Sequence, residues 1–328
     1  MKKSQFFTMM LVLAGLAGSS AAFAGQRYAL AIHGGAGVMS KERMTPERQQ
    51  MYLHHLDRAL AIGDSLLSRG ESSESAVVAV VSYLEDCPLF NAGRGAVFSY
   101  NGKAELDASI MEGKTLKAGA LTGVTDIKNP ITAVRHIMNH SEHVMLSGKG
   151  ASAYARKQGI ETVSNRYFHT KDRYESLQQL KRKERERSPS DNAGTVGCVA
   201  LDQEGNLCAG TSTGGMTGKR YGRIGDSPVI GAGTWADNNT CAVSCTGHGE
   251  YFIRLTVARD VASHMEYRNL DLEQAGRIVL DKLTRIGGTG GFIAIDHQGN
   301  ITLPFNTPGM FRGYRKSTGE KEIAIFAR

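Results

Sequence analysis

Cysteines and long apolar runs are scarce in this sequence of 328 residues. The five cysteines are too few and too scattered to hold a disulfide-built fold together, and none belongs to a C-x-x-C pair of the kind found in redox and zinc sites. The sequence leaves one disulfide possible and does not indicate which cysteines would form it. A single apolar run lies near the N-terminus, is too short to span a bilayer, and has no comparable run after it. The composition therefore excludes a disulfide scaffold and offers no transmembrane anchor.

Signature motifs of several enzyme classes are incomplete. Gly218-Lys219 does not finish a phosphate loop, because Thr213 stands where the loop needs glycine and Arg220 where it needs serine or threonine. No H-E-x-x-H pair of zinc hydrolases occurs. His33-Gly-Gly-Ala-Gly37 is expected to be a tight glycine turn after a short strand, but its spacing is not that of a dinucleotide-binding loop. We therefore expect neither a nucleotide site nor a zinc site.

The N-terminus has the three parts of a secretory signal peptide. Lys2 and Lys3 form a positive region, Met9 to Ala17 form an apolar region, and Ala22-Phe-Ala24 is a small-x-small cleavage site. We predict a signal peptide over residues 1–24. The mature protein is then exported, to the periplasm or outside the cell, with no membrane association once the signal is removed.

The positive charge of the chain does not point to nucleic acid. The formal net charge of +7 becomes +5 when the two lysines of the signal are subtracted. Much of the excess lies between Lys181 and Arg187, a run that mixes both signs and contains no aromatic side chain. The apolar pattern is also lost from about residue 165 to 194. We predict a charged, disordered linker there and no nucleic-acid partner.

Strands and helices come in runs rather than in strict alternation, which is typical of an α+β fold. The apolar periodicity predicts two hairpins of the same design, and Thr45-Pro46 and Ser72 open the first helices. The expected later elements are strands at Thr195 to Ala200, Leu207 to Thr213, Gly291 to Asp296 and Ile301 to Phe305, and helices near Glu250 to His264 and Asp271 to Arg285. We predict two packed antiparallel sheets with helices on both outer faces.

Thr195 lies where the charged run stops and an apolar strand begins. A threonine hydroxyl is a poor nucleophile unless a base lies beside it, and a threonine that is an N-terminus can use its own α-amine. This requires a cut before Thr195. Gly194 suits such a cut, because a residue without Cβ accepts strained backbone geometry. An ordinary Gly-Thr strand start is the alternative that these residues leave open.

Polar residues gather at strand ends in the second half of the chain. Arg223 offers a planar fork for a carboxylate and Asp226 an acceptor for an ammonium group, which together describe a site for an amino-acid head group. A surface ion pair is the alternative. The N–H groups of Thr246-Gly247 can face an oxyanion, and His248 is interpreted as pocket wall. Asp107, within an apolar strand, needs a buried partner and is either structural or functional.

Seven short motifs follow one another along the chain: His33 to Gly37, Cys87 to Gly93, Leu106 to Ala108, Gly194 to Gly197, Thr211 to Met216, Gly222 to Pro228 and Thr246 to Glu250. In this order they resemble the motifs of the plant-type asparaginases. These enzymes are also called isoaspartyl or beta-aspartyl peptidases and are members of the N-terminal-nucleophile hydrolase superfamily. The similarity runs from about Tyr28 to Met310, and it favours the nucleophile interpretation of Thr195.

The resemblance implies a precursor that cuts itself between Gly194 and Thr195. The α chain would begin at about Gly25 and the β chain would end at Arg328, so that residues 25–194 and 195–328 form one structural domain, a four-layer αββα sandwich. Two such units would associate as an (αβ)2 heterotetramer. Ala193 departs from the family, because many relatives carry His there, and processing can be tuned differently as a result.

The resemblance also implies roles for the site residues in releasing aspartate from L-asparagine or from an isoaspartyl dipeptide. Thr195 would attack the side-chain carbonyl and Thr213 would hold its α-amine, with no cofactor for catalysis. The remaining residues would bind the substrate: Thr246 and Gly247 at the oxyanion, Arg223 at the α-carboxylate, Asp226 and Gly249 at the α-ammonium, and Asn91 along the wall.

A structural sodium ion is a further implication of the resemblance. Main-chain carbonyls would wrap the ion, since hard oxygen ligands suit it. They belong to Leu84, Glu85, Cys87, Phe90, Ala92 and Arg94.

Two alternatives accompany this interpretation. A glycosylasparaginase shares the fold and the nucleophile but cleaves the link between a sugar and asparagine. An exported amino-acid-binding protein would use Arg223 and Asp226 without turnover, and its chain would stay uncut at Thr195.

Overall fold

The computed structural model describes residues 27–37, 39, 41–185 and 194–327. The predicted signal peptide of residues 1–24 and the end of the predicted linker, residues 186–193, lie outside the described residues.

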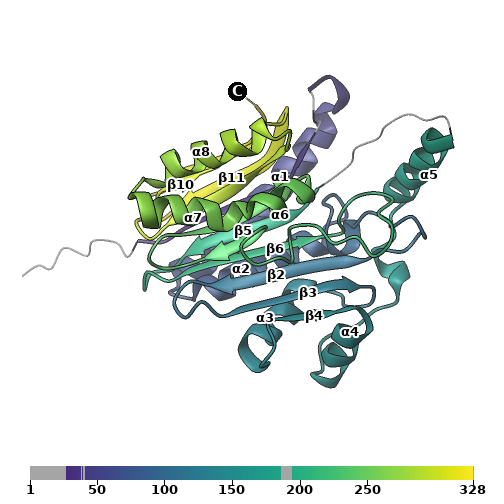
Figure 1. Cartoon of the computed structure of the whole chain (residues 1–328), viewed down its shortest axis with the longest axis horizontal. Coiled ribbons are helices and arrows are strands. Elements are labelled where there is room, and N and C mark those ends of the chain that lie inside the picture. The colour runs from purple at the N-terminus through teal and green to yellow at the C-terminus, as the bar shows by residue number, and fades with distance from the viewer. Residues whose placement is uncertain (1–26, 38, 40, 186–193, 328) are drawn as a thin grey trace, which may run out of the picture.

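Two β-sheets form the centre of the structure (Figure 1). The larger sheet has the strand order β12-β11-β1-β5-β6-β2-β3-β4, and the smaller has the order β10-β9-β8-β7. The pairings are antiparallel as predicted, except that β4 runs parallel to β3. The larger sheet contains β1 (Ala29–Gly37), β2 (Leu106–Glu112), β3 (Ala118–Val124), β4 (Met145–Ser147), β5 (Val196–Leu201), β6 (Leu207–Thr213), β11 (Gly309–Lys316) and β12 (Lys321–Phe326). The smaller contains β7 (Thr234–Ala236), β8 (Cys241–Gly247), β9 (Gly290–Asp296) and β10 (Ile301–Thr302).

Alternation along β1 shows how the layers arise. Leu30 and Ile32 join the apolar cluster between the larger sheet and the first helices, whereas Ala29 and Ala31 face the smaller sheet. The cluster between the sheets is rich in alanine, which lets the two backbones approach closely. A third cluster fills the space between the smaller sheet and the last helices. Helices therefore lie outside both sheets, as the sequence predicted.

The first two helices begin at the residues that the sequence indicated. Thr45 and Ser72 accept hydrogen bonds from the first turns of α1 (Pro46–Ser68) and α2 (Ser73–Asp86). Further helices are α3 (Pro130–His140), α4 (Gly148–Lys157) and α8 (Leu272–Arg285). The single helix predicted near residues 250–264 is wrong. Thr256 has a φ of +48° and divides it into α6 (Gly249–Leu255) and α7 (Val257–Arg268).

The predicted disordered linker is also wrong over its first part. A 3-10 turn covers Asn165–Phe168 and α5 spans Lys171–Arg185, standing at one end of the molecule in Figure 1. The side chain of Leu177 is buried, and the guanidinium of Arg173 donates to two main-chain carbonyls at 2.8 and 3.2 Å. Because α5 is held by the buried Leu177 and by polar contacts such as those of the Arg173 guanidinium, its sequence shows no apolar stripe.

The glycine turn expected at residues 33–37 is instead the second half of β1. The strand pairs with β11 on one edge and with β5 on the other. A register shift between His33 and Gly35 bends it, and Gly35 has a φ of +115°, which glycine tolerates. A Cβ on Gly35 would lie 3.3 Å from the Cα of Gly194, so this bend brings β1 against the candidate site.

Among the described helices, none combines the length and the apolar character that crossing a membrane requires.

Candidate active site

Thr195 lies immediately before β5, next to the end of β6. The two strands pair in antiparallel register, with Val196 opposite Ser212, which leaves Thr195 beside Thr213. The hydroxyl of Thr195 donates to Thr213 Oγ1 at 3.1 Å, and both side chains are buried. The hairpin thus holds a threonine hydroxyl in a fixed position at the border that the sequence indicated.

The carbonyl of Gly194 receives two strong donors. Thr213 Oγ1 donates to it at 2.9 Å and Asn91 Nδ2 at 2.6 Å. Asn91 Nδ2 also donates to Gly215 O at 2.7 Å, while its Oδ1 accepts from Val97 N at 2.9 Å. A carbonyl with two donors on its oxygen is polarised and fixed in orientation, and here it precedes a buried hydroxyl. The arrangement can favour attack on the bond between Gly194 and Thr195.

A small cavity joins this junction to Arg223 and Asp226, the two residues predicted to bind an amino-acid head group and called the clamp below. Its lining consists of Gly194, Thr195, Thr213, Gly215, Arg223, Gly225, Asp226, Ser227 and Gly247. Residues separated along the sequence thus come together as predicted. The surface ion pair considered for Arg223 and Asp226 is not what the structure contains, because Asp226 is buried.

One carboxylate oxygen of Asp226 lacks a donor among the described residues, although main-chain N–H groups of Asp226 and Ser227 interact with the carboxylate. Its Oδ2 is buried and has no hydrogen-bond partner there. Burial raises the pKa of Asp226 to about 7, and the nearby Arg223 lowers it in part. A buried carboxylate of this kind is stabilised by a cation that enters the cavity, such as an ammonium group.

Arg223 lies across the cavity from the hydroxyls and is bound by Glu250. Nε and Nη2 each donate to one carboxylate oxygen at 2.8 Å. The hydrogen bond from Arg223 lowers the pKa of Glu250 to about 2, so that it stays ionised. Sequence reasoning included Glu250 in the last motif but gave it no role, because its partner lies 27 residues away.

The predicted oxyanion and ammonium residues lie at the end of β8. Gly247 lines the cavity, and a Cβ there would lie 2.4 Å from Thr289 O. A Cβ on Gly249 would lie 2.9 Å from Asp226 Oδ1, so glycine is needed to leave that carboxylate accessible. The hydroxyl of Thr246 is buried and accepts from Ala36 N at 3.2 Å, which ties β8 to β1.

His33 is a site neighbour that sequence reasoning missed. Its Nδ1 lies 3.2 Å from Thr195 O and its Nε2 lies 3.0 Å from Ser244 Oγ. Burial lowers the pKa of His33 to about 3, so the ring is neutral at pH 7. Because a carbonyl oxygen only accepts, Nδ1 carries the proton and holds the main chain of Thr195. Its place in the first motif was the available signal, but that motif was interpreted as a turn.

Asp107 has a buried cationic partner, Lys219, which answers the question that its sequence position raised. Lys219 Nζ lies 3.4 Å from Asp107 Oδ2 and donates to Glu105 O at 2.9 Å. Asp107 also pairs with Thr213 across the β2 and β6 ladder. The buried ion pair therefore adjoins two residues that line the Thr195 cavity, Thr213 and Gly215.

Residues 210–214 match the letters G-x-S-x-G of serine hydrolases, a match that sequence reasoning overlooked. Ser212 lies within β6 and is fully buried, whereas the serine of that motif is exposed on a sharp turn before a helix. The match therefore carries no nucleophile.

The loop after α2 fits a cation held by main-chain oxygens. A Cβ on Gly93 would lie 2.4 Å from Glu85 O, and one on Gly95 would lie 2.1 Å from Phe90 O. Glycine at both positions leaves room beside main-chain carbonyl oxygens, which are ligands of the kind that a hard cation needs, and the sodium site stays a prediction. Among the described residues, no group of His, Cys, Asp and Glu side chains could hold a metal, and the five cysteines are free thiols.

Known proteins resemble this chain over nearly its full length. The asparaginase family matches residues 26–325. The isoaspartyl peptidase of Escherichia coli (strain K12) is 49% identical over 294 residues, which cover 87% of this chain and 92% of that protein. The probable isoaspartyl peptidase/L-asparaginase 2 of Arabidopsis thaliana is 41% identical over 325 residues, which cover 91% and 99%. Since the matched region contains the whole site described above, the chain belongs to the asparaginase family and is an amidohydrolase.

Proposed function

We propose that this protein is a self-processing hydrolase that releases L-aspartate from isoaspartyl dipeptides and from L-asparagine. One observation carries the proposal. The hydroxyl of Thr195 and the Gly194 carbonyl, whose oxygen accepts two hydrogen bonds, line one cavity together with a buried carboxylate and a guanidinium. These two charged groups belong to Asp226 and Arg223. The names of the relatives, isoaspartyl peptidase and isoaspartyl peptidase/L-asparaginase, support the same substrates.

The first reaction is the cut of the chain by itself. Thr195 Oγ1 attacks the Gly194 carbonyl carbon, the C–N bond between the two residues breaks, and the threonine nitrogen gains a proton. The product is an ester of Gly194 on Thr195 Oγ1 with a free Thr195 amine, and water then hydrolyses it to a Gly194 carboxylate and the Thr195 hydroxyl. Thr213 and Asn91 donate to the carbonyl oxygen on which negative charge develops.

The second reaction uses the new N-terminus. The α-amine of Thr195, with an ordinary pKa of about 8, takes the hydroxyl proton as Oγ1 attacks the side-chain carbonyl of the substrate. Gly247 N–H and the Thr246 hydroxyl stabilise the oxyanion. Ammonia or an amino acid leaves with that proton, and water then hydrolyses the aspartyl ester. Thr213 orients the amine.

The clamp selects a free amino-acid head group. The orphan oxygen of Asp226 binds the α-ammonium beside Gly249, and Arg223 binds the α-carboxylate. An acylated amine brings no positive charge to Asp226. We expect such substrates to be rejected, because the buried carboxylate would then stay uncompensated.

The other expectations complete the proposal. The two chains form the four-layer αββα sandwich and associate as (αβ)2, the leader of residues 1–24 directs export, and the carbonyls of Leu84, Glu85, Cys87, Phe90, Ala92 and Arg94 hold a sodium ion. The ion would fix the loop that carries Asn91. It would supply no chemistry to the reaction.

Intact mass and N-terminal sequencing of purified wild-type protein and of Thr195→Ala test the proposal. We expect two wild-type fragments, one beginning at Thr195, and one uncut chain in the variant. The cut protein should hydrolyse a β-aspartyl dipeptide. An uncut wild-type chain after long incubation would overturn the mechanism in favour of a binding protein, and activity on aspartyl-glucosamine alone would favour a glycosylasparaginase.

A further inference from the structure

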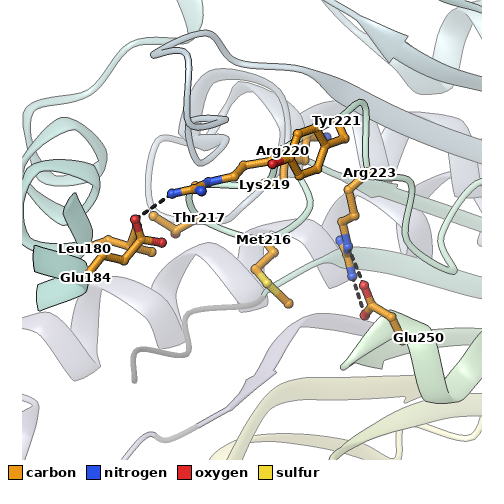
Figure 2. A pocket seen from close by; sticks show the side chains of 10 residues that line it. Leu180, Glu184, Met216, Thr217, Lys219, Arg220, Tyr221, Arg223 and Glu250 are labelled. Atoms are coloured by element: carbon orange, nitrogen blue, oxygen red, sulfur yellow. Dashed lines mark hydrogen bonds and ion pairs between the residues drawn. The ribbon is translucent and has the colours of Figure 1, made fainter. Parts of the chain in front are cut away.

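Two arginine–glutamate pairs face each other across a cavity of about 670 Å³ beside the clamp (Figure 2). One joins Arg223 to Glu250 through two bonds of 2.8 Å. The other joins Arg220 to Glu184 of α5 through one contact of 2.6 Å. The two glutamates are equally exposed, at 45% and 43% of their side-chain surface. Only Arg223 also lines the cavity that contains Thr195.

The two edges of the Arg223 guanidinium face different surroundings. Glu250 occupies the edge formed by Nε and Nη2, which uses two of the five N–H donors. Nη1 lies 3.5 Å from the place of a Cβ on Gly215 and 3.2 Å from that on Gly225, and both glycines line the Thr195 cavity. The second edge, formed by Nη1 and Nη2, is therefore the one turned toward the proposed substrate.

We propose that Glu250 is a positioning residue that fixes Arg223 so that its Nη1–Nη2 edge presents a bidentate site to the substrate α-carboxylate. This inference rests on the proposed function. It assigns Glu250 a part in substrate affinity and none in bond breaking, because Glu250 contacts the Nε–Nη2 edge of the guanidinium and does not line the Thr195 cavity.

Charge and flexibility explain why such a residue is needed. A free arginine side chain has many rotamers, and holding one of them costs binding energy unless another contact has already fixed it. Glu250 also lies 3.2 Å from His248 Nε2, so its own position is constrained by two groups. The carboxylate of Glu250 also offsets the charge of Arg223, while three N–H donors of Arg223 stay available for the substrate.

The test compares Glu250→Gln with the matched variant Glu184→Gln. For a β-aspartyl dipeptide we expect Glu250→Gln to raise KM on the order of tenfold, the value of one or two charge-assisted hydrogen bonds, and to change kcat by less than about twofold. Glu250→Asp, which keeps the charge, should recover part of the loss. Glu184→Gln should leave both constants at wild-type values, since Arg220 does not line the Thr195 cavity.

Calorimetric binding of L-aspartate supplies a readout that needs no turnover. We expect a weaker Kd for Glu250→Gln by the same factor, with the unfolding midpoint checked for each variant. An unchanged KM and Kd in Glu250→Gln, or an equal loss in Glu184→Gln, would overturn the inference while leaving the proposed function in place. Wild-type protein that neither binds aspartate nor hydrolyses the dipeptide would refute both.

Discussion

Asp226 shows how the site sacrifices stability for binding. A buried carboxylate with one unsatisfied oxygen is costly when ionised, and burial accordingly raises the pKa of Asp226 to about 7 from an ordinary 3.8. The folded protein keeps this proton at pH values where the unfolded chain has released it. The contribution of Asp226 to the free energy of unfolding is therefore greatest below about pH 4, falls between about pH 4 and 7, and stays low above that range.

Replacing Asp226 by Asn removes the charge and nearly keeps the shape. We expect Asp226→Asn to unfold at a temperature higher by at least about 2 °C near pH 8, with a smaller gain near pH 5. Both proteins would be melted in a Thr195→Ala background, so that neither is cut. The same change should abolish binding of L-aspartate. Equal midpoints at both pH values would contradict the assigned cost of the buried charge.

Four residues that the sequence analysis named line one cavity. Thr195, Arg223 and Asp226 were named for their chemical type and Thr213 through the family resemblance, and their roles in the reaction stay predictions. His33 and Glu250 could not be assigned in the same way. Their meaning depends on contacts with residues 162 and 27 positions away, which no local pattern records.

At the level of elements, capping residues predicted the starts of two helices correctly, whereas the apolar pattern missed one helix. Thr45 and Ser72 cap their helices through side chains, a local interaction that the sequence displays directly. Helix α5 packs through Leu177 and the guanidinium of Arg173, so its charged sequence resembled a linker. The division of α6 from α7 depends on one residue, Thr256, in a left-handed conformation.

The turn between β6 and the clamp depends on the buried pair of Asp107 and Lys219. The aliphatic stem of Lys219 packs against Gly215, whose N–H donates to Thr213 Oγ1 at 2.9 Å. Removing one charge leaves the other buried without its partner. We therefore expect Asp107→Asn and Lys219→Met each to destabilise the protein by about 3–5 kcal/mol.

The double variant is the sharper measurement. Because it buries no unpaired charge, Asp107→Asn with Lys219→Met should cost clearly less than the sum of the single changes in urea unfolding. The pair of Lys128 and Glu161, which lies nearer the surface, serves as the control, where Lys128→Met should cost much less than Lys219→Met. Additive losses at Asp107 and Lys219 would show that the two residues act independently.

The whole molecule is organised by an order of strands that the sequence did not reveal. Hairpins and layers followed from apolar periodicity, but both neighbours of β1 come from the second half of the chain. Its partner β11 begins at Gly309 and its partner β5 at Val196. Such pairings depend on packing between distant segments, for which one sequence without relatives gives no signal.

This strand order determines whether the two segments stay associated after the proposed cut before Thr195. Strands β1 to β4 precede the cut, whereas β5, β6, β11 and β12 follow it. Along the larger sheet the order therefore alternates between the two segments, and the pairings of β11 with β1, β1 with β5, and β6 with β2 all cross the cut. Separating the chains would break three ladders and open two apolar clusters, so the sheet itself holds them together.

We accordingly expect the cut protein to migrate as one species in size-exclusion chromatography, with both chains in equal amounts in the same fraction. They should separate only in concentrated guanidinium chloride, and residues 25–194 and 195–328 expressed apart should each fail to give a folded protein. The native mass tests the assembly too, because one αβ unit has at most 35.4 kDa and the proposed (αβ)2 form about twice that. Fragments that part under native conditions would contradict the interleaved sheet.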